Sequence, residues 1–425
     1  MNEDFLHYVW KFQLFNPHGL LTTEGEKVEV FKAGLPNQNA GPDFFNGQLK
    51  VGDTLWAGNV EIHLKSSDWF QHQHQTDKLY DKIILHVVWE NDREVRRESG
   101  ELIPTIELSG RVSKVLLERY KFLKKNENWV PCESELASVD QFVKLQQLDR
   151  MLVERLENKS RRIEQLLELN TNDWEAVFYQ MMCRYMGLKV NGTPFELLAT
   201  ALPYSILRKH QSDLLQLEAL LLGQAGLLEE DFKGDYPMRL QKEYRFLKNK
   251  YQLASIETSL WKFMRMRPSN FPTIRLAQLA ALIHKNKKFF EQLRETKSID
   301  QFYQLFDVAA SPYWDAHYRF DVPASRKRKK KMGQLTKDVL MINVAVPLLF
   351  VYAEKRDDEL GKQLAFQMLE EIPAEKNAIA KKWKALGMLL ESAFHSQALL
   401  QLKKEYCDHK RCLSCKIGNS ILRKQ

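Results

Sequence analysis

Alternating apolar and polar residues dominate the chain from about residue 26 to residue 108 and predict β-strands there. The runs that we interpret as strands are KVEVFKAG, FFNGQLKVGDTLW, NVEIHLK, KIILHVVW and LIPTIEL, and clusters of Gly, Asn, Asp and Pro separate them. Residues 3–15 before the strands have helical spacing. Residues 66–80 lie between two strands and predict a short helix with Ser67 or Asp68 as its N-cap. The expected order is therefore helix, strand, strand, strand, helix, strand.

The pattern changes to helical spacing from about residue 135 onward. In QFVKLQQLDRMLVERLENKSRRIEQLLELN, apolar residues recur along one face of a helix. These residues are Phe142, Leu145, Leu148, Leu152, Leu156, Ile163 and Leu167. Segments such as DWEAVFYQMMCRYMG, DLLQLEALLLGQAGLL and LGKQLAFQMLEEI behave in the same way, and no fixed repeat period is present. This half of the chain is therefore predicted to be all-helical.

Together the two patterns predict an α+β protein of three parts. We expect an N-terminal α/β domain with a mixed sheet at 1–130, an all-helical domain at 131–400 and a Cys-rich knuckle at 401–425. The N-terminus lacks the basic and apolar regions of a secretory signal, so the predicted location is cytoplasmic. The longest apolar run, at 339–353, is too short to span a membrane and is interrupted by Asn343 and Pro347. We interpret it as a buried helix with a kink and expect no membrane association.

The charge of the chain favours a polyanionic partner, nucleic acid in particular. The net charge is +8 and the pI is near 9.0. The strongest local contribution is a run of six cations: Arg326, Lys327, Arg328, Lys329, Lys330 and Lys331. This run is either a solvated loop between helices or a loop that contacts phosphates. The chain has no P-loop or dinucleotide-binding glycine motif, so an intrinsic ATPase or a dinucleotide-dependent enzyme is not expected.

Two further groups of polar residues fall on predicted helices. Arg155, Lys159 and Arg162 form a basic stripe on the first long helix, which is typical of a solvated face. Arg275 and Gln278 follow the Phe-Pro turn of PSNFPTIRLAQLAALI. They are either ordinary surface residues at a helix start, or the arginine binds phosphate or pairs with an acid.

A pair of acids carries the main chemical hypothesis. Asp43, in GPDF, stands at the entry to one strand, and Glu61, in NVEIHLK, lies on the next. Alternation places Glu61, His63 and Lys65 on one face. If the two strands pair through the turn at 51–53, the carboxylates of Asp43 and Glu61 meet at one end of the hairpin. Two such carboxylates suit Mg²⁺ or Mn²⁺, which would polarise a phosphoryl oxygen and activate water.

A second interpretation of the same segment needs no chemistry. Gly-Pro-Asp is a common turn sequence, and the polar positions of NVEIHLK also fit the solvent-facing side of an antiparallel sheet. His72 and His74 would then lie on a loop without a chemical role, and His86 would be a hydrogen-bonded core histidine. The two acids together with the histidine cluster make a metal site about as well supported as this interpretation without chemistry.

The order GPDF, VEIH and Lys65 resembles the Pro-Asp…(Asp/Glu)-x-Lys signature, PD-(D/E)XK, of the restriction-endonuclease-like phosphodiesterase superfamily. The resemblance implies a restriction-endonuclease-like mixed-sheet core, with Asp43 as the signature aspartate and Glu61 as the second acid. His63 stands where the superfamily usually has lysine. Lys65 is the candidate substitute for that lysine, and His63 is a candidate base or metal ligand.

The resemblance suggests further residues at the site. The superfamily often carries an acid on its first helix, for which Glu3 is the candidate, and some members carry Gln and Tyr on the helix after the signature. The accessory candidates here are His72, His74, Gln75, Tyr80 and His86. The whole chain also resembles an uncharacterised bacterial family, a domain of unknown function, in the segments FLHYVWKF, NAGPDF, GNVEIHLKSSDW and FPTIRLAQLA and in the cysteine tail.

Three of the five cysteines lie close together near the C-terminus: Cys407, Cys412 and Cys415. In a cytoplasmic chain such clustering favours metal over disulfides. His409 would complete a Cys₃His zinc site, and the alternative fourth ligand is Cys132 or Cys183. An iron–sulfur cluster is the less favoured metal centre, because C-x₄-C-x₂-C spacing also suits Fe–S ligation, and metal-free thiols are the remaining alternative.

The sequence therefore predicts a metal-dependent phosphodiesterase that cleaves nucleic acid. Asp43 and Glu61 would hold Mg²⁺ or Mn²⁺, with His63 and Lys65 supporting water activation or the developing charge. One alternative is a catalytically inactive nucleic-acid-binding or scaffold protein with the same fold. A third hypothesis is a His/acid metal hydrolase of a small molecule, which would need no affinity for a polynucleotide.

Overall fold

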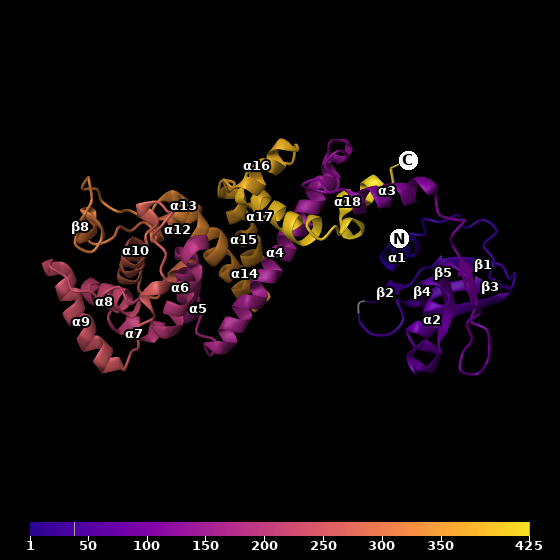
Figure 1. Cartoon of the computed structure of the whole chain (residues 1–425), viewed down its shortest axis with the longest axis horizontal. Helices are drawn as coiled ribbons and strands as arrows, with labels where there is room; N and C mark the ends of the chain where they lie inside the picture. Colours follow the sequence, from indigo (N-terminus) through magenta and orange to yellow (C-terminus); the bar gives the residue numbers. More distant parts are fainter. Residues whose placement is uncertain (38, 425) are drawn as a thin grey trace. The chain divides into compact units, whose positions relative to one another are not determined.

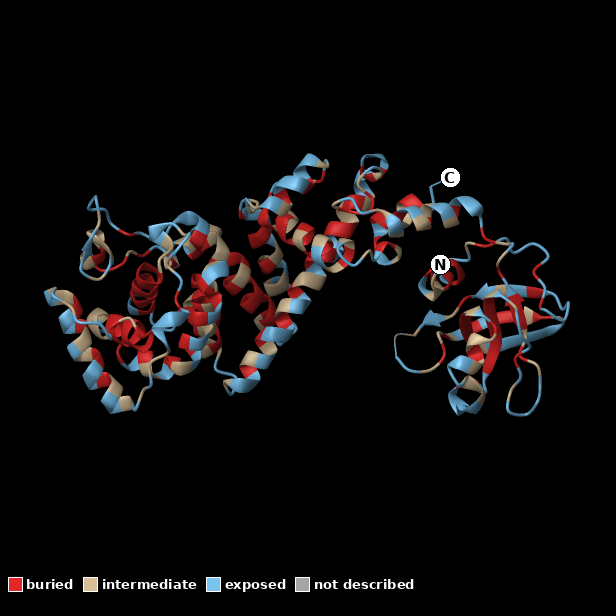
Figure 2. Ribbon diagram, viewed as in Figure 1, coloured by how far each residue is buried: buried red, intermediate tan, exposed pale blue. Residues whose placement is uncertain are grey.

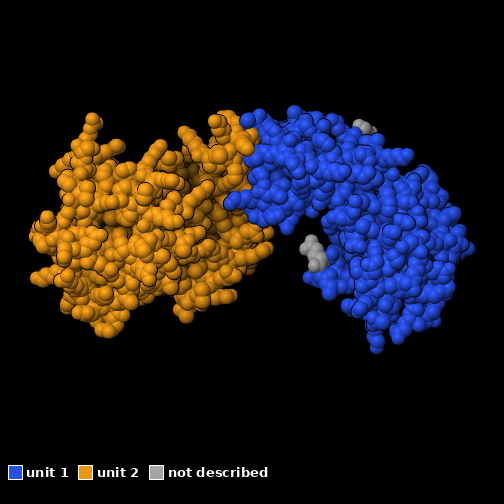
Figure 3. All heavy atoms as spheres, in the orientation of Figure 1, with its two compact units in different colours: residues 1–149, 385–388, 401–425 blue, residues 150–384, 389–400 orange. Residues whose placement is uncertain are grey.

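The computed structural model describes residues 1–37 and 39–424 and has the expected mixed α+β character. A curled mixed sheet lies in the N-terminal part, and the rest of the chain is largely helical (Figure 1). The chain forms two compact units (Figure 3). Unit 1 comprises residues 1–149, 385–388 and 401–425, and unit 2 comprises residues 150–384 and 389–400.

The sheet of unit 1 has the strand order β1-β3-β4-β5-β6, with the short β2 paired to β3. The strands are β1 Val28–Lys32, β2 Leu35–Pro36, β3 Phe44–Val51, β4 Thr54–Lys65, β5 Ile83–Glu90 and β6 Thr105–Glu107. β3 and β4 pair antiparallel through the predicted turn, from Val51 opposite Thr54 to Phe44 opposite Val60. The pairs β4–β5 and β5–β6 are parallel. The end of the predicted run FFNGQLKVGDTLW and the predicted run NVEIHLK thus belong to one long strand, β4.

The first helix is shorter than the sequence pattern predicts. Helix α1 spans Glu3–Lys11, with acids in its first turn and a lysine in its last, as the helix dipole favours. The predicted end at residue 15 is wrong, because Gln13 adopts a φ of 49° and Phe15 forms a β-bridge with Val112. α1 packs against β4 and carries buried Phe5, Leu6, Tyr8, Val9 and Trp10.

A parallel strand pair requires a crossover, and residues 66–82 supply it between β4 and β5. The crossover holds α2 Asp68–Gln71 and the 3₁₀ turns η1 His74–Thr76 and η2 Lys78–Tyr80. Trp69 is buried and packs with Tyr80, Ile83, Val95 and Ile103 in a hydrophobic cluster. This anchoring holds the histidine-containing part of the crossover close to the sheet.

Helices account for most of the remaining chain. Unit 1 also contains α3 Lys114–Lys125 and α18 Lys416–Leu422, and α4 Gln141–Leu169 begins in unit 1 and continues in unit 2. The following helices are α5 Trp174–Met186, α6 Leu188–Ala201, α7 Tyr204–Lys209, α8 Leu214–Gln224, α9 Asp235–Tyr251, α10 Pro272–Lys285, α11 Phe289–Glu295, α12 Ile299–Leu305, α13 Gln334–Leu340, α14 Val346–Glu354, α15 Glu359–Glu371, α16 Ala378–Ala385 and α17 Ala393–Gln401. Several of these helices bury one face, whereas α10 is buried along nearly its whole length (Figure 2).

Two details of the helical region differ from the sequence-based expectation. The short strands β7 His317–Arg319 and β8 Val322–Pro323 pair antiparallel, so the region is not purely helical. On α4, the predicted apolar stripe is buried from Leu148 to Leu167, whereas Phe142 is 65% exposed. Phe142 lies in the first turn of the helix.

The apolar run at 339–353 is a buried helix, as predicted, and a π-helical turn interrupts its α-helical hydrogen bonding. It comprises the end of α13, the π-helical turn η7 Met341–Ala345 and α14. The side chain of Asn343 donates to the carbonyl of Val339, at 2.9 Å. The segment Gln334–Glu354 is long and apolar enough to cross a membrane by composition, with a mean hydropathy of 1.6, but 72% of its most apolar window is buried inside the structure. Burial of this kind is typical of a core helix.

In the basic stripe of α4, Arg162 is exposed as the spacing suggests, whereas Arg155 and Lys159 are half-buried. The amine of Lys159 donates to Asn343 and to Gln397, each at 3.1 Å, and burial lowers the pKa of this amine well below its usual range. Arg155 also donates to Gln397. Arg275 on α10 is buried as well, and it donates to neutral oxygens of Asn270, Gln278 and Thr336. These cations thus have structural partners.

The close contact between β4 and β5 generates a stability prediction. A Cβ added to Gly58 on β4 would lie 2.5 Å from Cγ2 of Ile84 on β5. We therefore expect Gly58→Ala to lower the free energy of unfolding by about 1–3 kcal/mol, measured by thermal or urea denaturation. Gly110→Ala is the matched control, because a Cβ there meets no atom within 4 Å. Equal effects of the two substitutions would contradict this account of the sheet.

Candidate metal centre

The hairpin brings the two predicted acids together. The backbone N–H of Asp43 donates to Oε2 of Glu61 at 3.1 Å, and the N–H of Ile62 donates to Oδ2 of Asp43 at 3.0 Å. Each carboxylate therefore accepts a hydrogen bond from the strand that carries the other. The predicted approach of the two acids is confirmed.

The polar face of β4 is buried. Glu61 is 4% exposed and His63 is 1% exposed, because α1 and the crossover lie against β4. The interpretation of this face as the wet side of a sheet is therefore wrong at these two positions. A buried acid and a buried imidazole need partners, and the neighbouring histidines are those partners.

Four histidines gather around Glu61. Nδ1 of His63 lies 2.9 Å from Nε2 of His86, and Nε2 of His63 lies 3.1 Å from Nδ1 of His72. Oε1 of Glu61 lies 3.3 Å from Nε2 of His74 and 3.7 Å from Nε2 of His63. His63, His72 and His74 each offer one donor atom within 4.8 Å of the other two. Three imidazole nitrogens and one carboxylate oxygen thus converge.

Two of these separations, 3.1 and 3.3 Å, fit ligands around one metal ion. Ligand atoms held at about 2.1 Å from a common metal lie roughly 3.0–3.4 Å from one another. The buried Nε2 of His74 has no hydrogen-bond partner in the part of the chain that the structure describes. A tautomer of His63 that donates from Nδ1 to His86 leaves the Nε2 lone pair free for a metal, and such a hydrogen bond commonly orients a histidine ligand. The residues therefore fit a divalent transition metal.

The electrostatics of the centre suit cation binding. Burial, followed by the nearby carboxylate of Asp43, raises the pKa of Glu61 to about 8. Burial lowers the pKa of His63 to about 2 and that of His86 to about 3, with neighbouring imidazoles adding to both shifts. At neutral pH the rings of His63 and His86 are therefore neutral and Glu61 is protonated. A divalent cation would therefore displace one proton from the site.

Helix α1 supplies two residues to the edge of the centre. Nε2 of His7 lies 3.2 Å from Oδ2 of Asp43. Burial favours the neutral ring of His7, but the carboxylate of Asp43 outweighs it and raises the pKa of His7. Glu3, one helical turn earlier, lies within electrostatic range of His7, Asp43 and His72, and burial raises its pKa. The family resemblance indicated Glu3 but not His7, although the two residues are four apart on one helix face, a spacing that could have indicated both.

The remaining candidates divide into two groups. Tyr80 is close to the centre: its ring stacks on His74 with centroids 3.7 Å apart, and burial, with the carboxylates of Glu61 and Asp43, raises its pKa to about 12. The Oε1 atom of Gln75 is buried and unpartnered within the described residues. Lys65, in contrast, is exposed, and its amine lies 3.9 Å from Glu90. The charge of Lys65 is therefore directed toward Glu90 and not toward the centre.

The basic run at 326–331 lies in unit 2, between β8 and α13. Five of its six cations are exposed. Lys330 is the exception, because it is 6% exposed and its amine donates to the carbonyls of Asp315 and Arg328 and lies 4.1 Å from the ring centroid of Tyr318. Lys330 therefore anchors the loop and leaves the other five cations available to an anionic partner.

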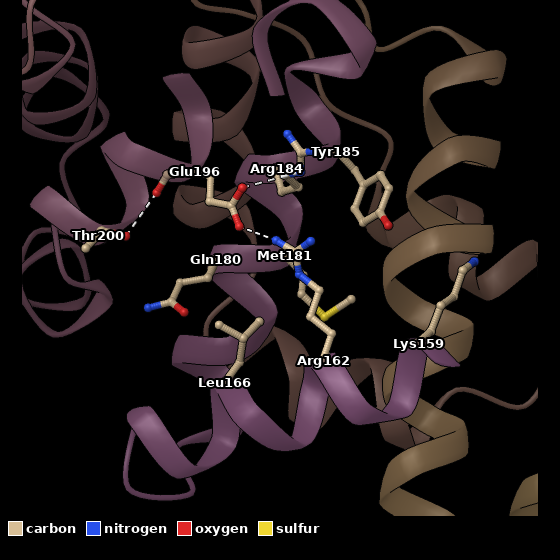
Figure 4. Close-up of a pocket in the computed structure, with 9 residues that line it drawn as sticks. All are labelled: Lys159, Arg162, Leu166, Gln180, Met181, Arg184, Tyr185, Glu196 and Thr200. Carbon is tan, nitrogen blue, oxygen red and sulfur yellow. Dashed lines mark hydrogen bonds and ion pairs between the residues drawn. The ribbon is translucent and has the colours of Figure 1, made fainter. Parts of the chain in front are cut away.

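A pocket in unit 2 lies among α4, α5 and α6 (Figure 4). It is lined by Lys159, Arg162, Leu166, Gln180, Met181, Arg184, Tyr185, Glu196 and Thr200. Arg162 and Arg184 both pair with the carboxylate of Glu196, and the Lys159 amine is hydrogen-bonded to other side chains. Because its cations are already paired, we assign this pocket no chemistry.

The cysteine tail is partly buried. Cys412 and Cys415 are 9% and 8% exposed, Cys407 is half-buried, and His409 is exposed. Cys183, one alternative fourth ligand, is buried within α5 of unit 2 beside Tyr179. Burial raises the pKa of this thiol.

The raised pKa of Glu61 predicts a pH-dependent stability in chelator-treated protein. Folding raises this pKa from 4.5 to about 8, so the folded state binds the extra proton and loses stability as pH rises through that interval. Glu61→Gln removes the titration. We expect its stabilisation relative to wild type to grow from about pH 4.5 to about pH 8, measured by the melting temperature in a pH series. A constant difference would contradict the assignment.

Comparison with known proteins gives one match. A family described as "Protein of unknown function (DUF2851)" matches residues 3–378, which include the acids and histidines of the centre. The comparisons with curated proteins and with solved structures returned no match. Because the matched region covers most of the chain, the protein belongs to the DUF2851 family.

Proposed function

We propose that the protein is a metal-dependent phosphodiesterase acting on nucleic acid, with the centre around Glu61 as its active site. The observation that carries the proposal is the convergence of Glu61 with the donor atoms of His63, His72 and His74, beside Asp43. The strand order of the sheet, with an antiparallel hairpin followed by a parallel strand, supports a restriction-endonuclease-like core.

The donor set indicates which metal the centre would hold. Imidazole nitrogens suit Mn²⁺ and later transition metals, whereas Mg²⁺ prefers an all-oxygen octahedral shell. The histidine that replaces the usual lysine of the signature is therefore a ligand in this proposal. Of the two metals expected from the acids alone, Mn²⁺ is the better fit.

The residues of the centre have distinct tasks in the proposed reaction. The bound metal would polarise the phosphoryl group and lower the pKa of a water. Glu61 and the three histidines hold the ion, and His86 orients the ring of His63 from the buried side. His7 is 33% exposed beside Asp43, and its raised pKa suits it to donate a proton to the leaving oxygen.

The charge of the chain supports a polyanionic substrate. The net charge is +8, and five exposed cations cluster on the loop at 326–331. Such charges bind phosphates without reading the base sequence, and their contribution weakens as salt rises. A catalytically inactive binding protein would share this affinity, so only a cleavage assay separates it from an enzyme.

A second candidate function is the hydrolysis of a small molecule. The observation that favours it is the imidazole-rich donor set, because hydrolases of several kinds use such ligands with a carboxylate. This candidate predicts turnover of a small phosphodiester such as bis-p-nitrophenyl phosphate without affinity for DNA or RNA.

Cleavage of labelled single-stranded and double-stranded DNA and RNA tests the main proposal. With Mn²⁺ we expect cleavage by the wild type and a loss of roughly 10²-fold or more in Glu61→Gln, the scale of a removed charge-stabilising or acid–base group. Glu29→Gln on β1 is the matched control because Glu29 pairs only locally with Lys27, and Lys65→Ala should also remain active. Wild-type rates in Glu61→Gln, or no cleavage by the folded wild type, would refute the proposal.

Metal binding gives an independent prediction. We expect the affinity for Mn²⁺, measured by calorimetry, to rise as the pH approaches about 8, because the cation displaces the Glu61 proton, whose pKa is about 8. His74→Ala should weaken binding by about tenfold or more. His18→Ala, on the exposed turn after α1, is the control and should bind like the wild type. A pH-independent affinity would argue that Glu61 is not a ligand.

A further inference from the structure

Four of the five cysteines form a cluster in unit 1, away from the histidines described above. The four-cysteine cluster consists of Cys132, Cys407, Cys412 and Cys415. Cys132 lies in the connection between α3 and α4, and the other three lie at the C-terminal end, where α18 contacts α3 (Figure 1). The tail residues and Cys132 are thus brought together by tertiary structure.

The C-terminal part of the cluster is a tight, internally bonded turn. The N–H groups of Lys410 and Arg411 donate to the carbonyls of Cys407 and Tyr406, at 3.1 and 2.9 Å. Lys410 adopts a φ of 50°, which reverses the chain. The N–H of Cys415 donates back to the carbonyl of Cys412 at 3.2 Å. These bonds fold the C-x₄-C-x₂-C spacing into a compact loop.

Close packing holds that loop against α18 and α4. A Cβ on Gly418 would lie 2.3 Å from the carbonyl oxygen of Cys412, so only glycine fits there. The N–H of Lys416 donates to the side chain of Gln147 on α4 at 2.8 Å. The turn around Cys132 is bonded as well, since the N–H of Glu135 donates to the Cys132 carbonyl at 3.1 Å.

The four thiols lie within electrostatic range of one another in all pairings. All four are free cysteines, and three of them are buried. Burial, followed by the neighbouring thiols, raises the pKa of Cys132 and of Cys412 to about 12. Buried thiols with raised pKa become thiolates when a cation replaces their protons.

Lysines surround the cluster and would offset the charge of a thiolate centre. Lys124 and Lys410 oppose the rise in the pKa of Cys412, and Lys403 does so for Cys407. The amine of Lys410 also donates to the carbonyl of Lys124 at 2.8 Å, which joins the two parts of the chain beside the cluster. Four thiolates around a divalent ion carry a net charge of about −2, which neighbouring ammonium groups stabilise.

We propose that the four-cysteine cluster binds a thiophilic metal, as a structural zinc ion or as an iron–sulfur cluster, and joins the C-terminal tail to the segment between α3 and α4. Four cysteine thiolates are a ligand set common to both. Cys132 is the fourth ligand in this proposal, in place of exposed His409. The proposed phosphodiesterase activity is not needed for it.

The test is the metal content of the full-length protein purified without added metal. We expect about one zinc ion per chain, or iron with acid-labile sulfide and a visible chromophore, and either result supports the proposal. Cys132→Ser should lower this content by about tenfold or more, whereas Cys183→Ser should leave it unchanged. A double variant, His72→Ala with His74→Ala, should also leave it unchanged, which separates this metal from any metal at the histidines.

A second measurement covers the case in which Cys132→Ser does not fold. Titration of wild-type thiols with a mercurial reagent should release the metal as the cluster cysteines react, and Cys132→His should keep the metal because imidazole can replace a thiolate. A folded wild type without zinc or iron would overturn the proposal. So would metal that persists in folded Cys132→Ser.

Discussion

The register of β3 against β4 is the constraint on which the centre depends. Phe44 stands opposite Val60, so Asp43 and Glu61 meet where the hairpin opens and each accepts a backbone hydrogen bond from the other strand. A slip of one residue would turn Glu61 and His63 to the opposite face of the sheet. A bulge between Phe44 and Gly47, where Asn46 adopts a φ of 57°, absorbs the irregularity that this register requires.

Burial determines the protonation states of the titratable groups inside the centre. Glu61, His63 and His86 are buried beneath a helix and an anchored crossover, whereas His74 is partly buried and His72 is exposed. Burial keeps the rings of His63 and His86 neutral and Glu61 protonated, as their shifted pKa values show. Neutral donors with free lone pairs are ready to bind a cation but gain little from one another. Such an arrangement gains stability from an ion that binds only the folded state.

The two proposed metal centres of unit 1 differ in donor chemistry. The histidine centre offers nitrogen and oxygen, while the four-cysteine cluster offers sulfur. Soft thiolates select zinc and iron–sulfur clusters, and imidazole with carboxylate admits a wider range of divalent ions. The reactive ion and the structural ion would thus be sorted by ligand type within one unit.

The sequence by itself determined the class of each half and the faces of the strands. Alternation in NVEIHLK was enough to place Glu61 and His63 on one side of β4, and the turn after Val51 was enough to predict their approach to Asp43. These features are local, because they depend on residues that are neighbours in the chain or across a single turn. Helical spacing likewise identified the long α4, although not the hydrogen bonds that Lys159 makes from it to Asn343 and Gln397.

Tertiary structure alone decided which distant residues complete each site. His72 and His74 reach Glu61 because Trp69 anchors the crossover, His7 arrives on a helix that packs across β4, and Cys132 joins a tail at the other end of the chain. It also directed Lys65 toward Glu90 and buried a face that alternation alone could not distinguish from a solvated one. The hydrophobic periodicity of a helix or strand indicates which residues share a face. It does not indicate what packs against that face, because packing depends on contacts between residues far apart in sequence.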